Sequence, residues 1–268
     1  MAIKLSLNTS TIQPQPLLEK IRLSAEAGFD GVELWLNDVY EHVGRGGEIR
    51  EVERALSDHG LSVPCVVAVR AWAEATPEEY PIALGEVRRR MELCARLGSP
   101  FIVATPPRGP CSKDQIVERY RDLLRIGREC GVRPTFEYIS FFQSCSRLSD
   151  AWSVVQSADE DDATLVVDAF HSFNSHSTLE DLRAIPLERI SHYHIDDADP
   201  AIPAGRQIDA DRVLPGDGPI PLRGEIQILK DKGYDGFVSL ELFHPDLWQR
   251  DPADLLRKGI GRLRDLGL

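Results

Sequence analysis

The chain has 268 residues, of which 42% are hydrophobic, so it can bury a full core as one large α/β barrel or as two small domains. Its formal net charge of -12 repels phosphate backbones, and the absence of any basic run argues against non-specific nucleic-acid binding. The 5 cysteines are scattered and lack CxxC spacing, which predicts reduced thiols and excludes a sequence signature of structural zinc or a redox pair.

The N-terminal segment MAIKLSLNTST has one lysine followed by a short mixed strand pattern. A secretory signal would instead place an apolar stretch after charged residues. No apolar stretch approaches the roughly 20 residues that a membrane-spanning helix needs. We therefore expect a cytoplasmic protein with no membrane contact.

Short β-branched runs alternate with longer helical patterns along the whole chain. These runs predict eight strands, at residues 3–9, 31–35, 62–69, 101–106, 134–139, 164–170, 190–196 and 237–243. Amphipathic stretches that end at glycine lie between them, at residues 17–28, 49–60, 82–98 and 116–131. Strands apolar enough for burial on both faces predict a (β/α)8 TIM barrel, and we interpret residues 1–268 as a single domain of this kind.

One long segment, residues 198–219, has no regular pattern. It contains Pro200, Pro203, Pro215 and Pro219 together with three glycines. A loop of this length in a compact domain is usually functional or disordered.

Four metal-competent side chains lie at the ends of the last four predicted strands. They are Glu137 in TFEY, Asp168 in VVDAFH, His194 in HYHIDD and Glu241 in SLELFH. The carboxyl ends of barrel strands carry the active site, and neighbouring strands let these side chains converge. Carboxylates with an imidazole suit one divalent ion, such as Mn²⁺, Co²⁺, Zn²⁺ or Mg²⁺.

Each of these residues also has an ordinary structural interpretation. Glu137 and Glu241 lie in apolar runs, where a buried carboxylate can instead pair with an arginine. Glu33 in GVELW has the same appearance, and we interpret it as a carboxylate that supports the site or the fold. His192 and His194 alternate on one strand and point to the same face, so one can bind metal while the other packs nearby.

Other polar residues near the strand ends stay open between a functional and a structural role. Asp196 could accept a hydrogen bond from an imidazole. His171 could cap a loop, and Arg212 could be an ordinary surface residue. Trp35 and Trp72 could line a pocket or pack in the core. By position alone, further pocket residues are Asn8, Arg70 and Thr105, whereas we expect surface or loop positions for His42, His59, His176 and His244.

The segments VVDAFH, HYHIDDADPAIP, DADRVLPGDGPI and FVSLELFHPDLW resemble the xylose isomerase-like TIM barrel superfamily of sugar isomerases and epimerases. The resemblance runs from end to end and is strongest to the inosose isomerase (2-keto-myo-inositol isomerase) branch. It implies one divalent metal held by Glu137, Asp168, His194 and Glu241.

The resemblance also implies a mechanism. His171 and Arg212 would bind substrate oxygens. Glu137 and Glu241 would act as catalytic acid and base, moving an α-proton through an enediolate that the metal stabilises.

Two departures from related enzymes narrow the chemistry. The segment TFEYISFF has no lysine, which disfavours the hydride shift of true xylose isomerases. The segments VAVRAW and VATPPRG have no histidine, unlike the corresponding parts of endonuclease IV-type members. The acidic charge agrees with the second departure, so DNA cleavage is disfavoured.

These features predict a metal-dependent isomerase of a small polyol ketone, an inosose or a ketose. A ketose 3-epimerase, or a dehydratase of inosose or dehydroshikimate, could use the same metal site, and a non-catalytic sugar-binding barrel is a further alternative. Asp217 in the PGDG turn would repel a phosphate, which favours a neutral substrate. A homo-oligomer is compatible with the sequence.

Overall fold

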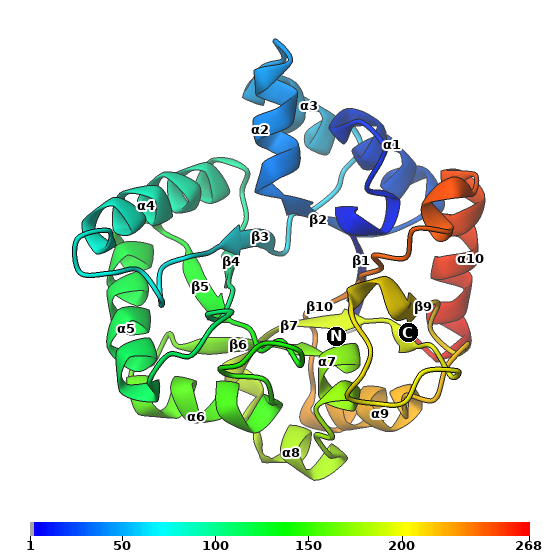
Figure 1. Cartoon of the computed structure of the whole chain (residues 1–268). Coiled ribbons are helices and arrows are strands. Elements are labelled where there is room, and N and C mark those ends of the chain that lie inside the picture. The colour runs from blue at the N-terminus through cyan, green and yellow to red at the C-terminus, as the bar shows by residue number, and fades with distance from the viewer. Residues whose placement is uncertain (1–2) are drawn as a thin grey trace.

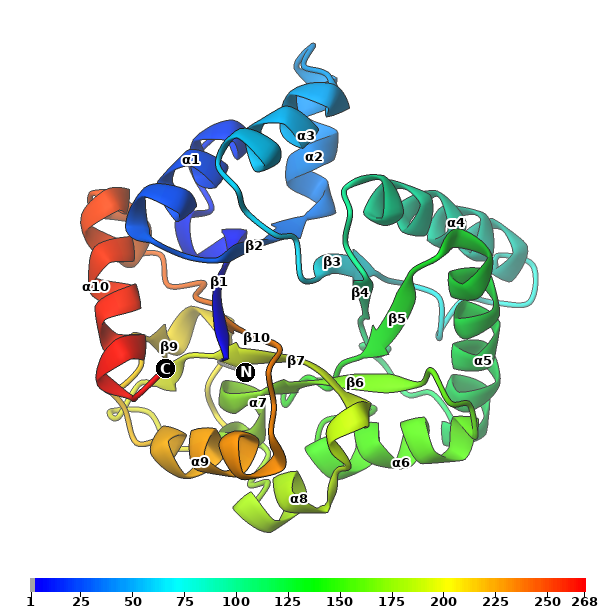
Figure 2. The same cartoon turned by 180° about the vertical axis from the view of Figure 1, so that it is seen from behind.

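The computed structural model describes residues 3–268 and contains a closed barrel of parallel strands (Figure 1). Around the barrel the strands follow the order β1, β2, β3, β4, β5, β6, β7 and β10, and β10 pairs again with β1. The helices form an outer ring around these strands, as the view from behind also shows (Figure 2). The predicted (β/α)8 fold is confirmed.

Seven of the eight barrel strands are shorter than the apolar runs that predict them, and β2 has the predicted bounds. The eight strands are β1 (Lys4–Asn8), β2 (Gly31–Trp35), β3 (Val66–Val69), β4 (Phe101–Ala104), β5 (Arg133–Phe136), β6 (Thr164–Asp168), β7 (Ile190–Ile195) and β10 (Phe237–Leu240). Most runs lose residues at their carboxyl ends, because the chain there leaves the sheet and turns into the loops above the barrel. Before β3, Ser62 makes only an isolated bridge with Gly31.

The outer helices are α1 (Leu17–Ala27), α2 (Leu36–Gly44), α3 (Ile49–Asp58), α4 (Tyr80–Arg96), α5 (Lys113–Cys130), α6 (Leu148–Ala158), α7 (Ala169–Asn174), α8 (Leu179–Ala184), α9 (Leu222–Lys232) and α10 (Pro252–Asp265). Four helices, α1, α3, α4 and α5, agree with the four predicted amphipathic stretches, and the structure contains further helices between the strands. Gly28 ends α1 with φ of 92°, a left-handed conformation that glycine adopts without strain.

Residues 198–219 contain more order than the sequence pattern indicates. The short strands β8 (Asp197–Ala198) and β9 (Arg212–Val213) pair in antiparallel fashion, and the 3-10 turn η3 (Asp209–Asp211) precedes β9. The Asp197 carboxylate accepts hydrogen bonds from the backbone N–H groups of Ala198, Gly216 and Ile220 at 2.9–3.0 Å. The segment is therefore a folded strap across the barrel mouth.

Side-chain alternation gives the barrel a polar interior at its carboxyl end. Successive residues of a strand point to opposite faces, so Glu33, His192, His194 and Ser239 share the inward face. In the sheet register both Asp168 and Ser239 lie opposite His194. The outward residues instead join the large apolar cluster under the helices.

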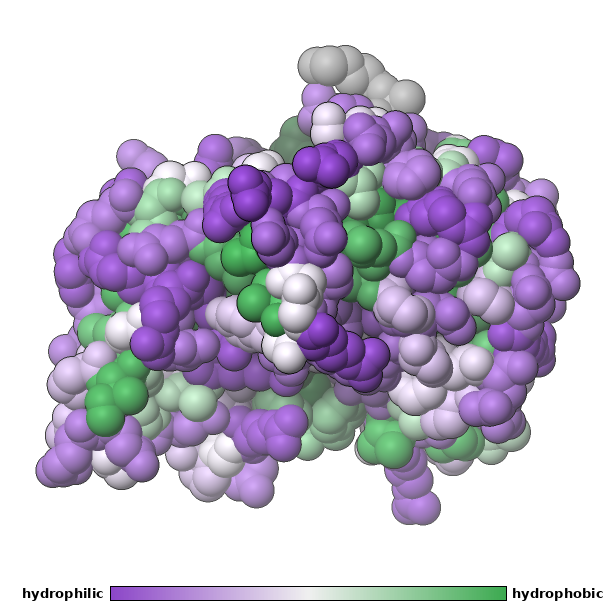
Figure 3. Space-filling model, turned by 90° about the horizontal axis from the view of Figure 1, so that it is seen from above, coloured by the Kyte–Doolittle hydropathy of each residue, from purple (hydrophilic) through white to green (hydrophobic). Residues whose placement is uncertain are grey.

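The face of the molecule seen in Figure 3 is mainly hydrophilic, with hydrophobic residues in small separate patches. Within residues 3–268 no helix is long and apolar enough to cross a membrane. The 5 cysteines are free thiols, in agreement with the sequence prediction.

Candidate metal centre

The four predicted ligands come from four neighbouring strands. Asp168 is the last residue of β6 and His194 lies near the end of β7, whereas Glu137 and Glu241 directly follow β5 and β10. Because β5, β6, β7 and β10 are adjacent in the barrel, all four side chains enter the same end of its interior.

The three carboxylates converge on one nitrogen of His194. Its Nδ1 lies 3.2 Å from Glu241 Oε2, 3.6 Å from Glu137 Oε1 and 3.6 Å from Asp168 Oδ2. Donor atoms of Glu137, Asp168 and His194 all lie within 4.8 Å of one another. Nδ1 is buried and has no hydrogen-bond partner within residues 3–268. A buried polar atom of this kind is costly unless something satisfies it.

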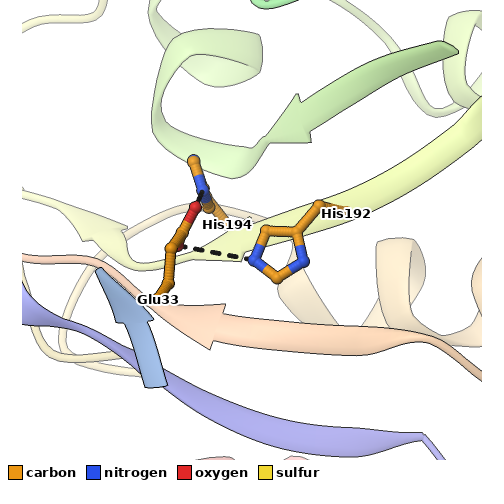
Figure 4. A group of neighbouring side chains, drawn as sticks. All are labelled: Glu33, His192 and His194. Atoms are coloured by element: carbon orange, nitrogen blue, oxygen red, sulfur yellow. Dashed lines mark hydrogen bonds and ion pairs between the residues drawn. The ribbon is translucent and has the colours of Figure 1, made fainter. Parts of the chain in front are cut away.

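Glu33 occupies the opposite side of the same imidazole (Figure 4). Its Oε1 lies 3.0 Å from His194 Nε2, and its Oε2 accepts hydrogen bonds from Asn8 Nδ2 and Ser239 Oγ, each at 2.9 Å. His192 Nε2 lies 3.4 Å from the same carboxylate. Since a carboxylate only accepts hydrogen bonds, Nε2 of His194 carries a proton and donates a hydrogen bond to Glu33.

Burial and neighbouring charges shift the pKa values of these groups strongly. Burial raises the pKa of Glu137 to about 7 and that of Glu241 to about 8. Burial would also raise the pKa of Glu33, but the charges of His194 and His192 hold it well below its usual range. Burial by itself would lower the pKa of His194. The negative charges of Glu241 and Glu33 have the larger combined effect, so the pKa of His194 lies well above 6.5.

The donor set fits a divalent cation. Three carboxylate groups and one imidazole nitrogen surround a common point, and a cation there would satisfy Nδ1 and offset the mutual repulsion of the carboxylates. The neighbouring group of Glu33, His192 and His194 also has ligand-like spacing. It fits a cation less well, because Asn8, Ser239 and His194 already direct hydrogen bonds at both oxygens of Glu33.

Arg212 is fully buried and links the strap to the metal-site carboxylates. Its Nη1 donates to Asp168 Oδ2 at 2.9 Å and to Asp196, and lies 3.4 Å from Glu241 Oε2. Its Nη2 donates to Asp209 Oδ1 at 3.0 Å. Burial alone would raise the pKa of Asp168, but Arg212 and the nearby histidines lower it below its ordinary value. The surface alternative for Arg212 is therefore wrong.

His171 lies beside Arg212. Its Nε2 lies 3.1 Å from Arg212 Nη2, and because a guanidinium only donates, Nε2 accepts. Its Nδ1 lies 3.2 Å from Ser140 Oγ, and the backbone N–H of Ser140 also points at it at 3.5 Å. Burial lowers the pKa of His171, in agreement with a neutral ring. A neutral imidazole at this position can exchange hydrogen bonds with substrate hydroxyls.

The remaining residues divide between the site and the core. Asp196 pairs with Arg212, so the structure does not support the idea that it orients an imidazole, and Glu33 has that position. Trp72 is a fully buried packing residue against Tyr120 and Phe136. Trp35 is half-buried at the rim.

Asn8 makes a connection that the sequence did not reveal. Its Nδ2 donates to Glu33 and also to Glu241 Oε1 at 2.8 Å, and its Oδ1 accepts from the indole of Trp35 at 2.8 Å. The position of Asn8 at a strand end was the only signal in the sequence, since its partners lie far away along the chain.

The comparison with known families agrees with the fold and the site. The model described as "Xylose isomerase-like TIM barrel" matches residues 21–266, so the chain belongs to this family. The family includes sugar isomerases, epimerases and dehydratases, and the buried cluster of histidine, glutamate and aspartate is consistent with a metal ion.

Individual relatives have several activities. An inosose isomerase of Halalkalibacterium halodurans is 27% identical over 263 residues, covering 95% of this chain and 93% of the relative. A 3-dehydroshikimate dehydratase of Pseudomonas aeruginosa is 27% identical over 236 residues, covering 85% of this chain and 36% of the relative. A crystal structure of the IOLI protein with a bound zinc atom has a TM-score of 0.92 and 24% identity, covering 98% of both chains.

Proposed function

We propose that the protein is a divalent-metal-dependent isomerase of a polyol ketone. It removes the proton from the carbon beside the carbonyl group and so shifts the carbonyl to that carbon, and an inosose is the first candidate substrate. The observation that carries this proposal is the convergence of Glu137, Asp168 and Glu241 on the unpartnered Nδ1 of His194. The similarity to inosose isomerases over 95% of the chain supports the substrate class.

Glu137, Asp168, His194 and Glu241 would hold the metal. When bound, a divalent cation would polarise the substrate carbonyl and stabilise the negative charge that develops as the α-proton leaves. Asp168 stays ionised beside Arg212 and serves as a permanent ligand.

Glu137 and Glu241 would be the acid and base. Their side chains keep 10% and 5% exposure, whereas those of Asp168 and His194 keep at most 1%, so the glutamates border the open side of the site. A pKa near neutrality suits a group that takes a proton and then returns it. One glutamate would remove the α-proton, and a glutamate would return a proton to the neighbouring carbon.

His171 and Arg212 would position the substrate. The neutral ring of His171 and the guanidinium of Arg212 lie in contact beside Asp168, where hydroxyl groups of a substrate bound at the metal would reach them. Both side chains are held by other buried groups, which reduces the entropy lost on binding.

A dehydratase is the second candidate, since 3-dehydroshikimate dehydratases match 85% of this chain. The first proton transfer would be the same, but the electrons left by the α-proton would expel a β-hydroxyl as water. A ketose 3-epimerase would instead return the proton to the opposite face of the same carbon.

The test is an NMR deuterium-exchange assay on protein loaded with Mn²⁺, then stripped of excess metal before the spectra, with 2-keto-myo-inositol, ketohexoses and 3-dehydroshikimate. The expected result is that deuterium from the solvent enters the product and that the carbonyl group of the product lies on the carbon next to its original position. An epimeric ketose or loss of water would identify the alternative activities. Glu241→Gln should lower turnover by at least about 100-fold, and full turnover in this variant, or no exchange with any ketone, would contradict the proposal.

A further inference from the structure

A side cavity of about 350 Å³ lies at the barrel mouth, between the η1 turn (Thr9–Ile12), the first turn of α1 and helix α2. Its volume falls in the range of roughly 300–1,000 Å³ that is usual for ligand pockets. In the described part of the chain, none of the four proposed metal ligands lines this cavity, and neither does His171 or Arg212. The side cavity is therefore not part of the site already described.

Two aromatic rings separate the side cavity from the metal centre. Trp35 and Phe243 both line the cavity, and their rings meet edge to face with centroids 5.7 Å apart. Towards the metal centre, the Trp35 indole donates to Asn8 Oδ1 at 2.8 Å, and the guanidinium carbon of Arg212 lies 5.4 Å from the centroid of Phe243. The cavity and the metal centre thus share one wall, made by these two rings.

The lining of the side cavity includes a buried ammonium group that has unused donors. Lys20 is 1% exposed, and its Nζ donates a hydrogen bond to Asp38 Oδ2 at 2.8 Å. Thr9 Oγ donates to the same oxygen at 3.0 Å. An ammonium has three N–H groups, so two of them, and Oδ1 of Asp38, have no protein partner within residues 3–268. Buried donors without partners are costly, and oxygen atoms of a ligand would satisfy them.

Neutral polar groups complete the lining. The side-chain amides of Gln13, Gln15 and Asn37 form no hydrogen bond with the described residues. Ser10 is 3% exposed, and its hydroxyl likewise has no partner among residues 3–268. Amides and hydroxyls both donate and accept hydrogen bonds. This mixed set of donors and acceptors matches the hydroxyl groups of a ligand.

The charges around the side cavity are already paired. Each ionisable side chain of the lining lies within ion-pair distance of a group of opposite sign. The pairs are Lys20 with Asp38, Arg45 with Glu41, and His42 with Glu51. A charged ligand would find no excess of the opposite charge to offset its loss of hydration, whereas a neutral ligand needs none.

We propose that the side cavity is a second binding site, separate from the metal centre, for a neutral polyhydroxylated ring. Hydroxyl groups of the ring would accept from Lys20 and donate to Asp38, and others would exchange hydrogen bonds with the amides. The C–H face of the ring would pack against Trp35 and Phe243. Binding there needs no metal, so this inference does not rest on the proposed function.

The test titrates methyl glucoside, a ring without a free carbonyl group, into the zinc-loaded protein and into the protein in a chelator. Proton–nitrogen NMR follows the indole signals, and Trp35→Phe identifies that of Trp35. We expect the Trp35 signal to shift in a saturable way in both samples, because no metal ligand lines the cavity. The signal of the fully buried Trp72 should stay in place.

Matched variants locate the ligand through the dissociation constant from the same titration. Gln15→Ala combined with Asn37→Ala removes two amides and should weaken binding roughly 5- to 100-fold, the effect of losing two hydrogen bonds. Gln156→Ala, which removes an exposed amide of α6, should leave the dissociation constant unchanged. His171→Gln, at the metal centre, should also leave it unchanged.

An unmoved Trp35 signal would overturn the second site, as would equal binding by the wild type and the double amide variant. Loss of binding in His171→Gln alone would place the ligand at the metal centre instead. Tighter binding of methyl glucuronoside, which adds a carboxylate to the same ring, would overturn the assignment to a neutral ligand. The exchange assay with ketones tests the proposed function separately, so either inference can fail while the other stands.

Discussion

Glu33 lies on the side of His194 that faces away from Glu137, Asp168 and Glu241, the proposed metal ligands. Its carboxylate holds His194 Nε2 at 3.0 Å and accepts from Asn8 and Ser239. A carboxylate behind a ligating imidazole fixes the ring orientation and keeps the other nitrogen available for metal. Figure 4 shows this side chain pointing at both imidazoles of β7.

We expect Glu33→Gln to weaken zinc binding by roughly 10- to 100-fold. An amide cannot accept from His194, Asn8 and Ser239 as the carboxylate does, and an NH2 group facing Nε2 would shift the ring proton to Nδ1, where the metal should bind. Competition with a chromophoric chelator measures the dissociation constant.

Ser239→Ala is the matched control for this prediction. It removes one hydrogen bond to Glu33 but leaves the contact between Glu33 and His194, so the affinity for zinc should change by less than about 3-fold. Nitrogen NMR of the metal-free variants would report the tautomer of His194. An unchanged zinc affinity in Glu33→Gln would show that Glu33 only fills the barrel interior.

At the scale of elements, the strap of residues 198–219 decides where Arg212 lies. Strand β9 begins at Arg212 and pairs with β8, so the guanidinium enters the site from a segment outside the barrel wall. Asp197 holds the strap through three backbone N–H groups. Gly218 lies against this anchor, where a Cβ would overlap the carbonyl of Ala198 and the side chain of Asp197.

Gly218→Ala should therefore destabilise the protein by about 1–3 kcal/mol, the usual range for overpacking. The backbone near Asp197 must move, and the strap that carries Arg212 moves with it. Urea denaturation measures the free energy of unfolding of each variant. Gly261→Ala in α10, where a Cβ meets nothing within 4 Å, should be neutral or slightly stabilising. Equal stability of the Gly218 variant and the wild type would mean that the strap adapts without cost.

At the scale of the whole molecule, closure of the barrel places residues from both ends of the chain in one buried charged cluster. Asn8 reaches Glu241 across 233 positions of sequence because β1 pairs with β10. The cluster concentrates carboxylates with raised pKa values in a low-dielectric interior. Folding of the metal-free protein is therefore coupled to proton binding.

We expect the metal-free protein to lose stability as the pH rises from about 6 to about 9. Glu137 and Glu241, with pKa values near 7 and 8 in the folded state, hold protons there that the unfolded chain releases at lower pH. His194 acts in the same direction, since its pKa is raised in the folded state. Melting temperatures in a chelator would measure the fall, at about 2–4 °C per kcal/mol.

Added zinc should raise the melting temperature, and by more at higher pH, because metal replaces protons on the ligands. Glu241→Gln, whose amide does not titrate, should flatten the decline seen in the chelator. A melting temperature that is constant or rises with pH in the metal-free wild type would contradict the assignment of raised pKa values.

The sequence by itself determined the features that depend on neighbours along the chain. Alternating apolar runs and glycine-ended helices predicted the barrel, because strand and helix periodicity are local properties, although the strand ends were placed up to several residues too late. The polar residues at the ends of β5, β6, β7 and β10 could be selected because the fold directs such ends to one mouth.

Only the tertiary structure decided the contacts between distant segments. Asn8 beside Glu241, Glu33 behind His194, and Arg212 in contact with Asp168 each depend on barrel closure or on the path of the strap. A residue's charge partners are set by distances in space, and local sequence patterns contain no measure of those distances.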